Sequence, residues 1–304
     1  MSAPLLSIVI ANYNYGRFLE EAIQSVVAQK MGNKVELIIC DAASTDNSVE
    51  IIKKYANGLP PNTSYHEWMS RTNSQLPTHN TQLITWWCSE KDGGQSAAFN
   101  KGFARARGKY LTWLNADDGL VAGCLKQVVS EMERFPDCEW FTGNFYRFTQ
   151  DGRIIDVGWG PHYYPNLLQQ TNSPVVVFGP TSFFSKSAWE RIGKIDDHLT
   201  LIMDTDLWIR FIKAGVKQRR VSCFCWAFRM HSDSKTAEYD DHVIDDSTSK
   251  RMKAENDYVV CKNSYKASAF LYILLCTWRL LDGSFVKRAI LKQTMKTIKV
   301  KGPQ

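Results

Sequence analysis

Short apolar runs alternate with helically spaced apolar positions along the first half of the chain. The runs have the length of buried strands and occupy residues 6–11, 35–40, 84–88 and 110–114. After the first run, the apolar residues recur at the spacing of one helix face, at Phe18, Leu19, Ala22, Ile23 and Val26. Strands and helices in alternation predict an α/β fold with a parallel sheet and right-handed crossovers.

The residues that follow these four runs are mostly polar. They are Asn12, Tyr13 and Asn14 after the first, Asp41 after the second, Asp92 after the third, and Asn115, Ala116, Asp117 and Asp118 after the fourth. Because the carboxyl ends of parallel strands lie at one edge of a sheet, we expect these residues to converge there. Carboxylate and amide oxygens are hard ligands, so this edge indicates a metal and diphosphate site. An alternative stays open, since Asp also caps helices and closes turns.

The second half of the chain is less regular. Residues 138–149 and 153–157 alternate apolar and polar positions around Asp151 and Gly152, which predicts a hairpin. A helix is predicted to begin near Asp204 and Asp206, with apolar residues at core spacing at Leu207, Trp208, Phe211 and Ile212. A strand is expected over 219–228, with Cys223 and Cys225 on one face. The spacing of this cysteine pair is more typical of core packing than of a metal site.

Three segments carry other compositions. Residues 57–82 are rich in Pro, Asn, Thr, Ser and His and read as a loop or insertion, either functional or ornamental. Residues 240–246 are acidic and predict a loop before a helical tract. Residues 267–281 are strongly apolar but shorter than the ~20 residues of a membrane span. The basic tail behind them favours either an interfacial helix on an anionic membrane surface or a helix packed on the domain or on a second copy.

Composition narrows the class. The chain has 304 residues and is 44% hydrophobic, enough for one large domain or two smaller ones. Its net charge of +6 suggests attraction to phosphates or an anionic membrane and does not require nucleic acid. The first apolar run is too short for a signal peptide, so we expect a cytoplasmic protein with its eight cysteines reduced.

Four segments together resemble the family 2 glycosyltransferases of GT-A fold, especially bacterial enzymes that build cell-surface polysaccharides. They are SIVIANYNYGRFLEEAIQSVVAQ, VELIICDAASTDNSVEIIKKY, SEKDGGQSAAFNKGFARARGKYLTWLNADD and MDTDLWIRF, and the similarity covers residues 6–231. The resemblance implies a Rossmann-like nucleotide-binding sheet with helices on both faces. It places a GT-A domain at 1–235, with a nucleotide half (1–120) and an acceptor half (121–235), followed by a C-terminal helical extension (236–304).

The resemblance also implies roles for particular residues. The nucleotide would be held by Ala11, Asn12, Tyr13, Asp41, Asp92, Asn115 and Ala116. Asp117 matches the last acid of the family's D-x-D and would ligate Mn²⁺ or Mg²⁺, with His231 nearby; His231 could instead be a satisfied core residue. Asp204 matches the catalytic base that takes the proton of the acceptor hydroxyl. The diphosphate and acceptor side would involve Arg229, Lys235, Asp206 and Trp208.

Two positions depart from the family pattern. Ala42 replaces a second acid after Asp41, and Asn115 replaces the first acid of D-x-D. An amide supplies no charge to a metal, so metal affinity should be weaker than in members with both acids.

The expected reaction is inverting transfer of a sugar from a nucleotide-diphosphate donor to a saccharide or lipid-linked saccharide. A nucleotidyltransferase and a catalytically silent nucleotide-sugar-binding scaffold remain alternatives. The first would be expected to carry a basic glycine-rich phosphate loop, whereas residues 12–16 have only Arg17 nearby. The second draws weak support from Ala42 and Asn115.

Overall fold

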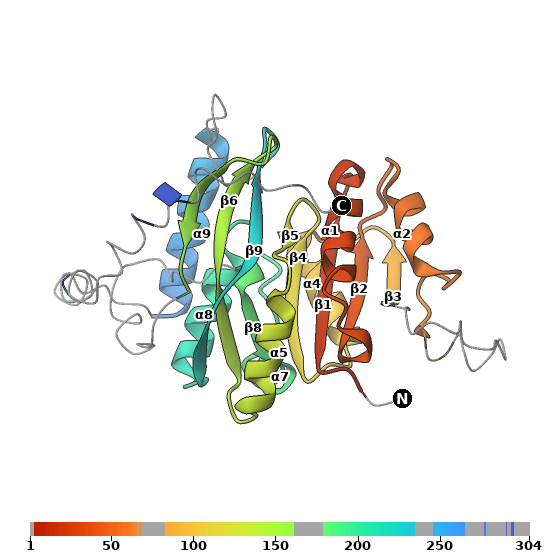
Figure 1. The fold of residues 1–304 in the computed structure, drawn as a ribbon. Coiled ribbons are helices and arrows are strands. Elements are labelled where there is room, and N and C mark those ends of the chain that lie inside the picture. The colour runs from red at the N-terminus through yellow and green to blue at the C-terminus, as the bar shows by residue number, and fades with distance from the viewer. Residues whose placement is uncertain are drawn as a thin grey trace.

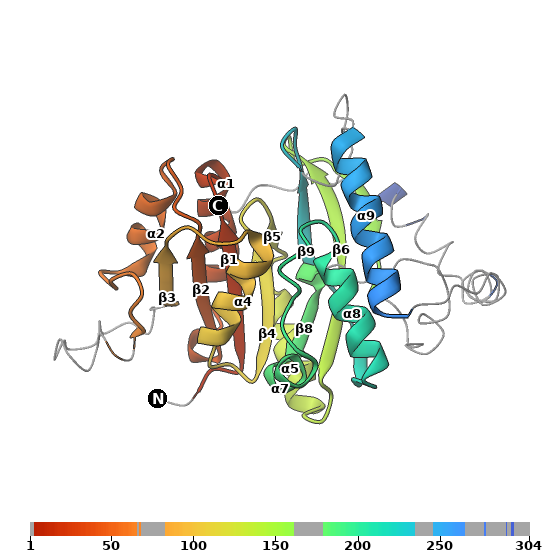
Figure 2. The ribbon, with the colours of Figure 1, turned by 180° about the vertical axis from the view of Figure 1, so that it is seen from behind.

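The computed structural model describes residues 3–65, 67, 83–160, 179–234 and 246–264, with 277, 290 and 293–294. Within these residues one nine-stranded sheet runs through the molecule in the order β3-β2-β1-β4-β8-β6-β9-β5, with β7 paired to β6. Helices cover both faces of the sheet, α1 and α5 on one side (Figure 1) and α4 and α8 on the other (Figure 2). The predicted α/β class is therefore confirmed.

The first part of the chain, residues 1–120, forms the parallel part of the sheet. Its strands are β1 (Leu6–Asn12), β2 (Val35–Asp41), β3 (Ile84–Ser89) and β4 (Tyr110–Asn115), all parallel, and its helices are α1 (Gly16–Val27), η1 (Gly32–Lys34), α2 (Ser48–Ala56) and α4 (Gln95–Arg105). All four strands lie where the apolar runs predict them. Because they are parallel and adjacent, their carboxyl ends share one edge.

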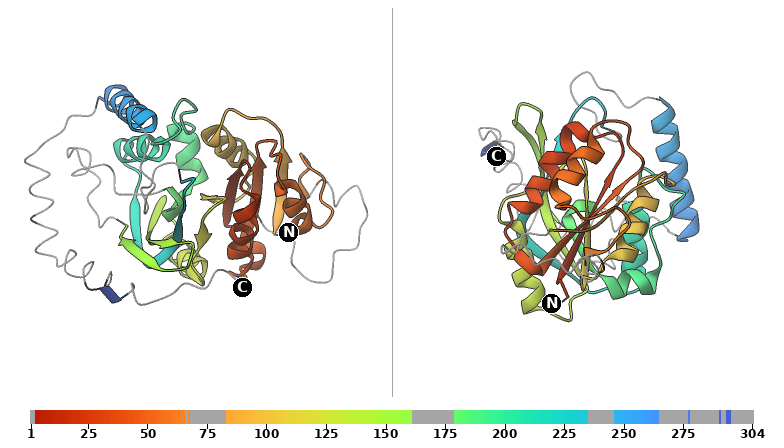
Figure 3. Two further views of the ribbon diagram at one scale, coloured as in Figure 1. Left: turned by 90° about the horizontal axis from the view of Figure 1, so that it is seen from above. Right: turned by 90° about the vertical axis from the view of Figure 1, so that its right-hand side faces the viewer.

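The second half continues the same sheet. Its elements are β5 (Gly119–Leu120), α5 (Cys124–Arg134), β6 (Trp140–Thr149), β7 (Ile154–Gly158), η2 (Gly179–Thr181), β8 (Ser182–Ser185), α7 (Lys186–Ile192), α8 (Met203–Lys213), β9 (Gln218–Met230) and α9 (Asp246–Lys262). β6 and β7 form the predicted antiparallel pair, and β8 joins β4 to β6. The helix at α8 and the strand at β9 are also where the sequence predicts them. Figure 3 shows the two halves side by side along the continuous sheet.

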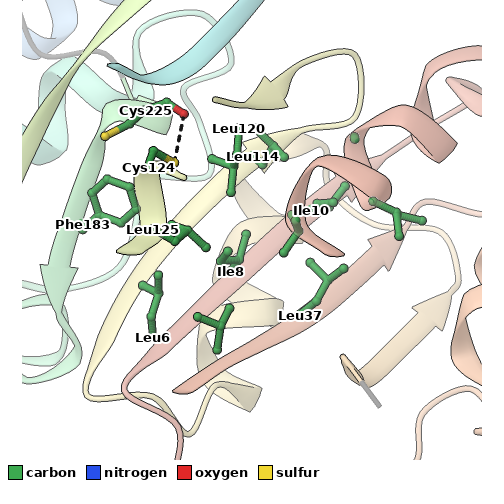
Figure 4. Packing of buried hydrophobic residues seen from close by; sticks show 14 of the residues in the cluster. Leu6, Ile8, Ile10, Leu37, Leu114, Leu120, Cys124, Leu125, Phe183 and Cys225 are labelled. Carbon is green, nitrogen blue, oxygen red and sulfur yellow. Dashed lines mark hydrogen bonds between the residues drawn. The ribbon is translucent and has the colours of Figure 1, made fainter. Parts of the chain in front are cut away.

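Core packing explains why the parallel strands are apolar along their whole length. Ile8 and Ile10 of β1 point into the layer under α1 and α5 (Figure 4), and Val9 points to the opposite layer with Phe99. A parallel sheet covered on both faces buries both alternating sets of side chains. On the second face α4 lies very close to β1, since a Cβ at Gly102 would meet Val9 Cγ1 at 2.3 Å.

The cysteines in the described residues are all free. Cys223 and Cys225 lie on one face of β9 with their Sγ atoms 3.5 Å apart, and Cys124 Sγ donates to the Cys225 carbonyl at 3.7 Å (Figure 4). The expected reduced thiols are thus confirmed for this part of the chain.

Several expectations for the ends and loops lie largely outside the described residues. They concern most of the 57–82 segment, the acidic 240–246 loop, the apolar 267–281 segment and the basic tail. The first part of the C-terminal helical tract is confirmed as α9. No helix in the described ranges is long and apolar enough to cross a membrane.

Candidate active site

A cavity of about 870 Å³ opens over the carboxyl edge of the parallel strands. This volume is within the roughly 300–1,000 Å³ of small-molecule sites. One wall comes from the ends of β1, β2 and β4, and the other comes from η2, the start of α8 and α9. Eight residues singled out from the sequence line it: Ala11, Asn12, Tyr13, Asp92, Asn115, Ala116, Asp117 and Asp204. The parallel topology thus brings the strand-end residues together as expected.

Asp41 is buried behind the first wall and does not line the cavity. Its Oδ1 accepts from Asn12 Nδ2 at 2.7 Å, and its Oδ2 accepts from Ser89 Oγ at 2.6 Å and from the Ser44 N–H at 3.0 Å. Both carboxylate oxygens are therefore occupied by protein donors. Asp41 orients Asn12 and the following turn, whose Ala42 and Ala43 face the cavity in its place.

Two buried acceptor atoms in this wall lack a partner among the described residues. They are Asn12 Oδ1 and Asp92 Oδ2. The other Asp92 oxygen accepts from the Gly94 N–H at 2.8 Å, which fixes the side chain at the start of α4. A buried acceptor without a donor is unfavourable by about 1–3 kcal/mol, so a ligand that presents N–H or O–H groups would relieve it.

Asn115 is held by two neighbours. Its Oδ1 accepts from Gln95 Nε2 at 3.0 Å, and its Nδ2 donates to Asp118 Oδ2 at 2.8 Å. Asp118 is buried and also accepts from the Arg229 N–H at 2.9 Å. Burial, with the Asp117 charge adding to it, raises the pKa of Asp118 well above its usual range. Asp118 thus joins the β4 turn to β9.

Asp117 and His231 are two side chains of metal-ligating type that contact each other. His231 Nε2 lies 3.2 Å from Asp117 Oδ2, and the imidazole packs on Phe18 with ring centroids 4.7 Å apart. The Asp233 N–H donates to His231 Nδ1 at 3.2 Å, which favours the tautomer that carries its proton on Nε2 and donates to Asp117. In that state His231 orients the carboxylate, and its Nε2 can bind a metal only in the other tautomer, which carries the proton on Nδ1.

The described residues contain no cluster of three or more metal-ligating side chains. A carboxylate that lines the cavity, as Asp117 does, fits a divalent ion that takes its remaining ligands from a bound diphosphate and water. The residues present therefore suit a metal shared with a ligand and not a site built from protein alone.

Arg229 is turned away from the cavity. Its Nε donates to the Asp117 carbonyl at 3.0 Å, its guanidinium pairs with Glu21, and it lies between the rings of Phe18 and Phe148. These contacts hold the Asp117 turn against α1 and leave no guanidinium face for a diphosphate. Lys235, expected beside it, lies outside the described residues. The cations that line the described part of the cavity are Lys91 and Arg147.

Asp204 lines the opposite wall, in the first turn of α8. Its Oδ1 accepts from the Thr205 N–H at 2.7 Å and its Oδ2 from the Gly179 N–H at 3.3 Å. Removal from water raises the pKa of Asp204 to about 6, against the lowering effect of these hydrogen bonds. A carboxyl with this pKa is ionised at neutral pH and basic enough to accept a proton during a reaction.

Comparison with known proteins decides the family. Residues 7–68 and 76–193 match Glycosyl transferase family 2. The chain belongs to this family.

Its relatives in the family are distant. An uncharacterized glycosyltransferase of Methanocaldococcus jannaschii is 23% identical over 278 residues, which is 90% of this chain and 88% of that protein. Chondroitin synthase of Pasteurella multocida is 23% identical over 76% of this chain but 21% of its own length. A Nostoc glycosyltransferase is 34% identical over 37% of this chain and 28% of its own. The chain therefore spans less than a third of two of these three relatives.

Among solved structures, S. aureus TarS residues 1–349 in complex with UDP-GlcNAc has a TM-score of 0.55 and 15% identity, and the likeness covers 78% of this chain and 60% of that 1–349 chain. This likeness concerns the fold, which is the GT-A fold expected from the sequence.

Two further expected site residues of α8, Asp206 and Trp208, do not line the cavity. Asp206 is fully buried and accepts from Arg210 Nε at 2.8 Å and Asn263 Nδ2 at 3.0 Å. Trp208 stacks between Trp113 and Trp140 at centroid distances of 5.6 and 5.1 Å. Asp206 is turned away from the cavity, because a step of two residues from Asp204 turns a side chain about 200° around a helix. Trp208 lies one turn beyond Asp204 and is kept in the core by its two indole neighbours.

Other residues that line the cavity were not singled out from the sequence. Arg147 of β6, Met252 of α9 and residues 200–203 before Asp204 line the cavity. No motif marks them, since each reaches the site only through tertiary packing. Tyr15 is also there, and burial, then the charge of Asp117, raises its pKa to about 12.

Proposed function

We propose that this chain is an inverting glycosyltransferase that moves a sugar from a nucleotide-diphosphate donor to a hydroxyl of a saccharide or lipid-linked saccharide. The observation that carries the proposal is the position of Asp204. A carboxyl with a pKa near 6 faces the same cavity as the strand-end residues of the nucleotide half. The strand-end residues and Asp204 share one cavity, which suits a sugar donor and a sugar acceptor that are bound at the same time.

The nucleotide would occupy the strand-end wall. Asn12 Oδ1 and Asp92 Oδ2 have no hydrogen-bond donor among the described residues, and a nucleobase and a ribose both present such donors. Tyr13 is 59% exposed and lines this wall, where a ring can cover a bound base. Asp41 acts through Asn12, which it holds at 2.7 Å.

In the transfer step Asp204 accepts the proton of the acceptor hydroxyl as its oxygen attacks the anomeric carbon. The new carbon–oxygen bond forms on the face opposite the leaving diphosphate, whose bond to the anomeric carbon breaks, so the configuration inverts. The Gly179 and Thr205 N–H groups hold the carboxylate in place for this transfer.

Mn²⁺ or Mg²⁺ is part of the proposal. Asp117 would hold the ion, and His231 would orient Asp117 or join it as a ligand in the tautomer that leaves Nε2 without a proton. When bound, such an ion neutralises charge that develops on the leaving diphosphate. A single acid in the D-x-D position, with Asn115 as its partner, predicts weaker metal affinity than two acids would give.

The acceptor belongs to surface polysaccharide synthesis in this proposal. Support comes from the names of relatives, including chondroitin synthase and the minor teichoic acid biosynthesis protein GgaB of Bacillus subtilis, which is 24% identical over 76% of this chain and 23% of its own length. Work at the inner face of the plasma membrane would follow from the apolar 267–281 segment and the basic tail. Flotation with anionic and neutral vesicles tests that part.

A donor screen tests the proposal as a whole. Uridine, guanosine and thymidine diphosphate sugars are offered with Mn²⁺ or Mg²⁺, and nucleoside diphosphate release and product mass are measured. Release of diphosphate with transfer of the sugar supports the proposal. Release of pyrophosphate from a nucleoside triphosphate and a sugar phosphate would support a nucleotidyltransferase instead. Calorimetric binding without any turnover would support a silent scaffold.

A further inference from the structure

Helix α9 packs beside α8, on the side of the molecule that carries Asp204 (Figure 2). The family match ends at residue 193, so α9 lies beyond it. Its contacts nevertheless concentrate on the segment that leads into the first turn of α8.

Glu255 of α9 makes the main contact. It is 7% exposed. Its Oε1 accepts from the Thr200 N–H at 3.1 Å and the Thr200 hydroxyl at 2.9 Å, and its Oε2 accepts from the Leu201 N–H at 2.9 Å and the Ile202 N–H at 3.3 Å. Burial alone would raise the pKa of Glu255, but these hydrogen bonds lower it below its usual value. One ionised carboxylate thus gathers three consecutive backbone N–H groups.

These groups directly precede Asp204. Helix α8 begins at Met203, and its N-cap residue Ile202 has no side-chain cap of its own. An anion near a helix N-terminus is favourable because the N–H groups there point outward unsatisfied. Glu255 therefore holds the three residues that lead into α8, and it sets the path of the chain two residues before Asp204.

A second contact holds the chain just after Asp204. Asn263, which follows α9, donates to Asp206 Oδ1 at 3.0 Å, and Lys262 Nζ lies 3.3 Å from Asp206 Oδ2. The C-terminal region thus fixes both sides of the proposed base. It also reaches the cavity itself, because Met252, one turn before Glu255, lines it together with residues 200–205.

We propose that α9 belongs to the acceptor side of the catalytic cavity, with Glu255 as the positioning residue for Asp204 and Met252 as a contact for the acceptor. This inference rests on the proposed function, since it takes Asp204 as the base. The segment 200–202 is the connection, because it donates hydrogen bonds to Glu255 and also lines the cavity.

Glu255→Gln tests the positioning role. It puts an amide donor against backbone N–H groups and should loosen the segment. We expect kcat to fall about 10- to 100-fold, as for misplaced catalytic groups, with the donor KM unchanged. The acid limb of the kcat profile should also move below pH 6, because Asp204 becomes rehydrated. The other charged groups that line the cavity, Lys91, Asp92, Asp117 and Arg147, are not altered. A purely structural role would not move this limb.

Asp257→Asn is the matched control. It makes the same charge change on the exposed side of α9 and should leave kcat and the pH profile unchanged. Met252→Trp tests the contact role and should raise the acceptor KM several-fold at constant donor KM; an unchanged acceptor KM would remove Met252 from the acceptor site.

The outcomes separate this inference from the proposed function. If Glu255→Gln has the kcat and the acid limb of the wild type while Asp204→Asn is inactive, the positioning role is overturned and the proposed base stays in place. An active Asp204→Asn would overturn the proposed base itself. If Glu255→Gln no longer binds donor nucleotide in calorimetry, Glu255→Asp takes its place, keeping the charge on a shorter side chain, and the same shift is expected. Loss of folding in both variants would also refute the inference, because Glu255 would then act on global stability.

Discussion

Asp204→Asn should lower activity while raising stability. The pKa of Asp204 rises from the ordinary 3.8 to about 6 because the carboxyl is removed from water. A raised carboxyl pKa means that folding opposes ionisation, so the ionised group destabilises the fold by about 3 kcal/mol above pH 6 and not at all below pH 4. Asparagine removes this destabilisation but weakens the hydrogen bonds from the Gly179 and Thr205 N–H groups. That weakening lowers the stability of the variant by about 1–2 kcal/mol.

Urea unfolding at pH 7.5 should therefore show a variant more stable by about 1–2 kcal/mol, with a difference that falls by about 3 kcal/mol and reverses sign toward pH 4, where only the loss of hydrogen bonding remains. Turnover with a cognate donor and acceptor should fall about 10²- to 10⁴-fold, the usual contribution of a general base. The wild-type rate should rise with pH through about 6 as Asp204 ionises. Near-normal turnover by the variant would refute the base, and lower stability at pH 7.5 would refute the argument that Asp204 is held ionised at a cost.

Three further predictions concern other parts of the site and core. EDTA should abolish transfer and Mn²⁺ restore it in the wild type, whereas Asp117→Asn should remain about 100-fold slower at saturating Mn²⁺; full activity in EDTA would refute the metal. Gly179→Ala should destabilise the fold by about 1–3 kcal/mol in urea, because its Cβ would lie 2.1 Å from Trp113 Cζ2, and an unchanged midpoint would contradict this contact. Trp208→Ala should cost about 3–5 kcal/mol by the same measurement, since Trp208 is buried between two other indoles, and a loss under 1 kcal/mol would contradict that packing.

The parallel half of the fold could be predicted well because its signals are local. A buried parallel strand needs a short apolar run, and a helix beside it needs one apolar face, so β1, β2, β3 and β4 were all located. The same locality placed Asp117 and Asp204 at a strand end and a helix start. Both line the cavity.

Side-chain direction was harder to predict. Arg229 and Asp41 carry the right charges next to the right elements, yet Arg229 points to Glu21 and Asp41 is enclosed by donors such as Asn12 and Ser89. A one-residue change of position on a strand reverses the face, and sequence spacing alone does not say which face meets the cavity. Arg147, which does meet it, has no motif around it.

The sequence by itself determined the fold class and the edge of the sheet where polar residues gather, because apolar runs, helical patterns and strand-end polarity are properties of neighbouring residues, and the resemblance of four segments indicated the family. Only the tertiary structure decided which of the charged groups face the cavity and how Asp204 is held. Its raised pKa comes from burial, it accepts from the N–H of Gly179, 25 residues before it, and the segment that leads to it donates to Glu255, 51 residues after it. Desolvation and long-range hydrogen bonds arise only when such distant segments pack together.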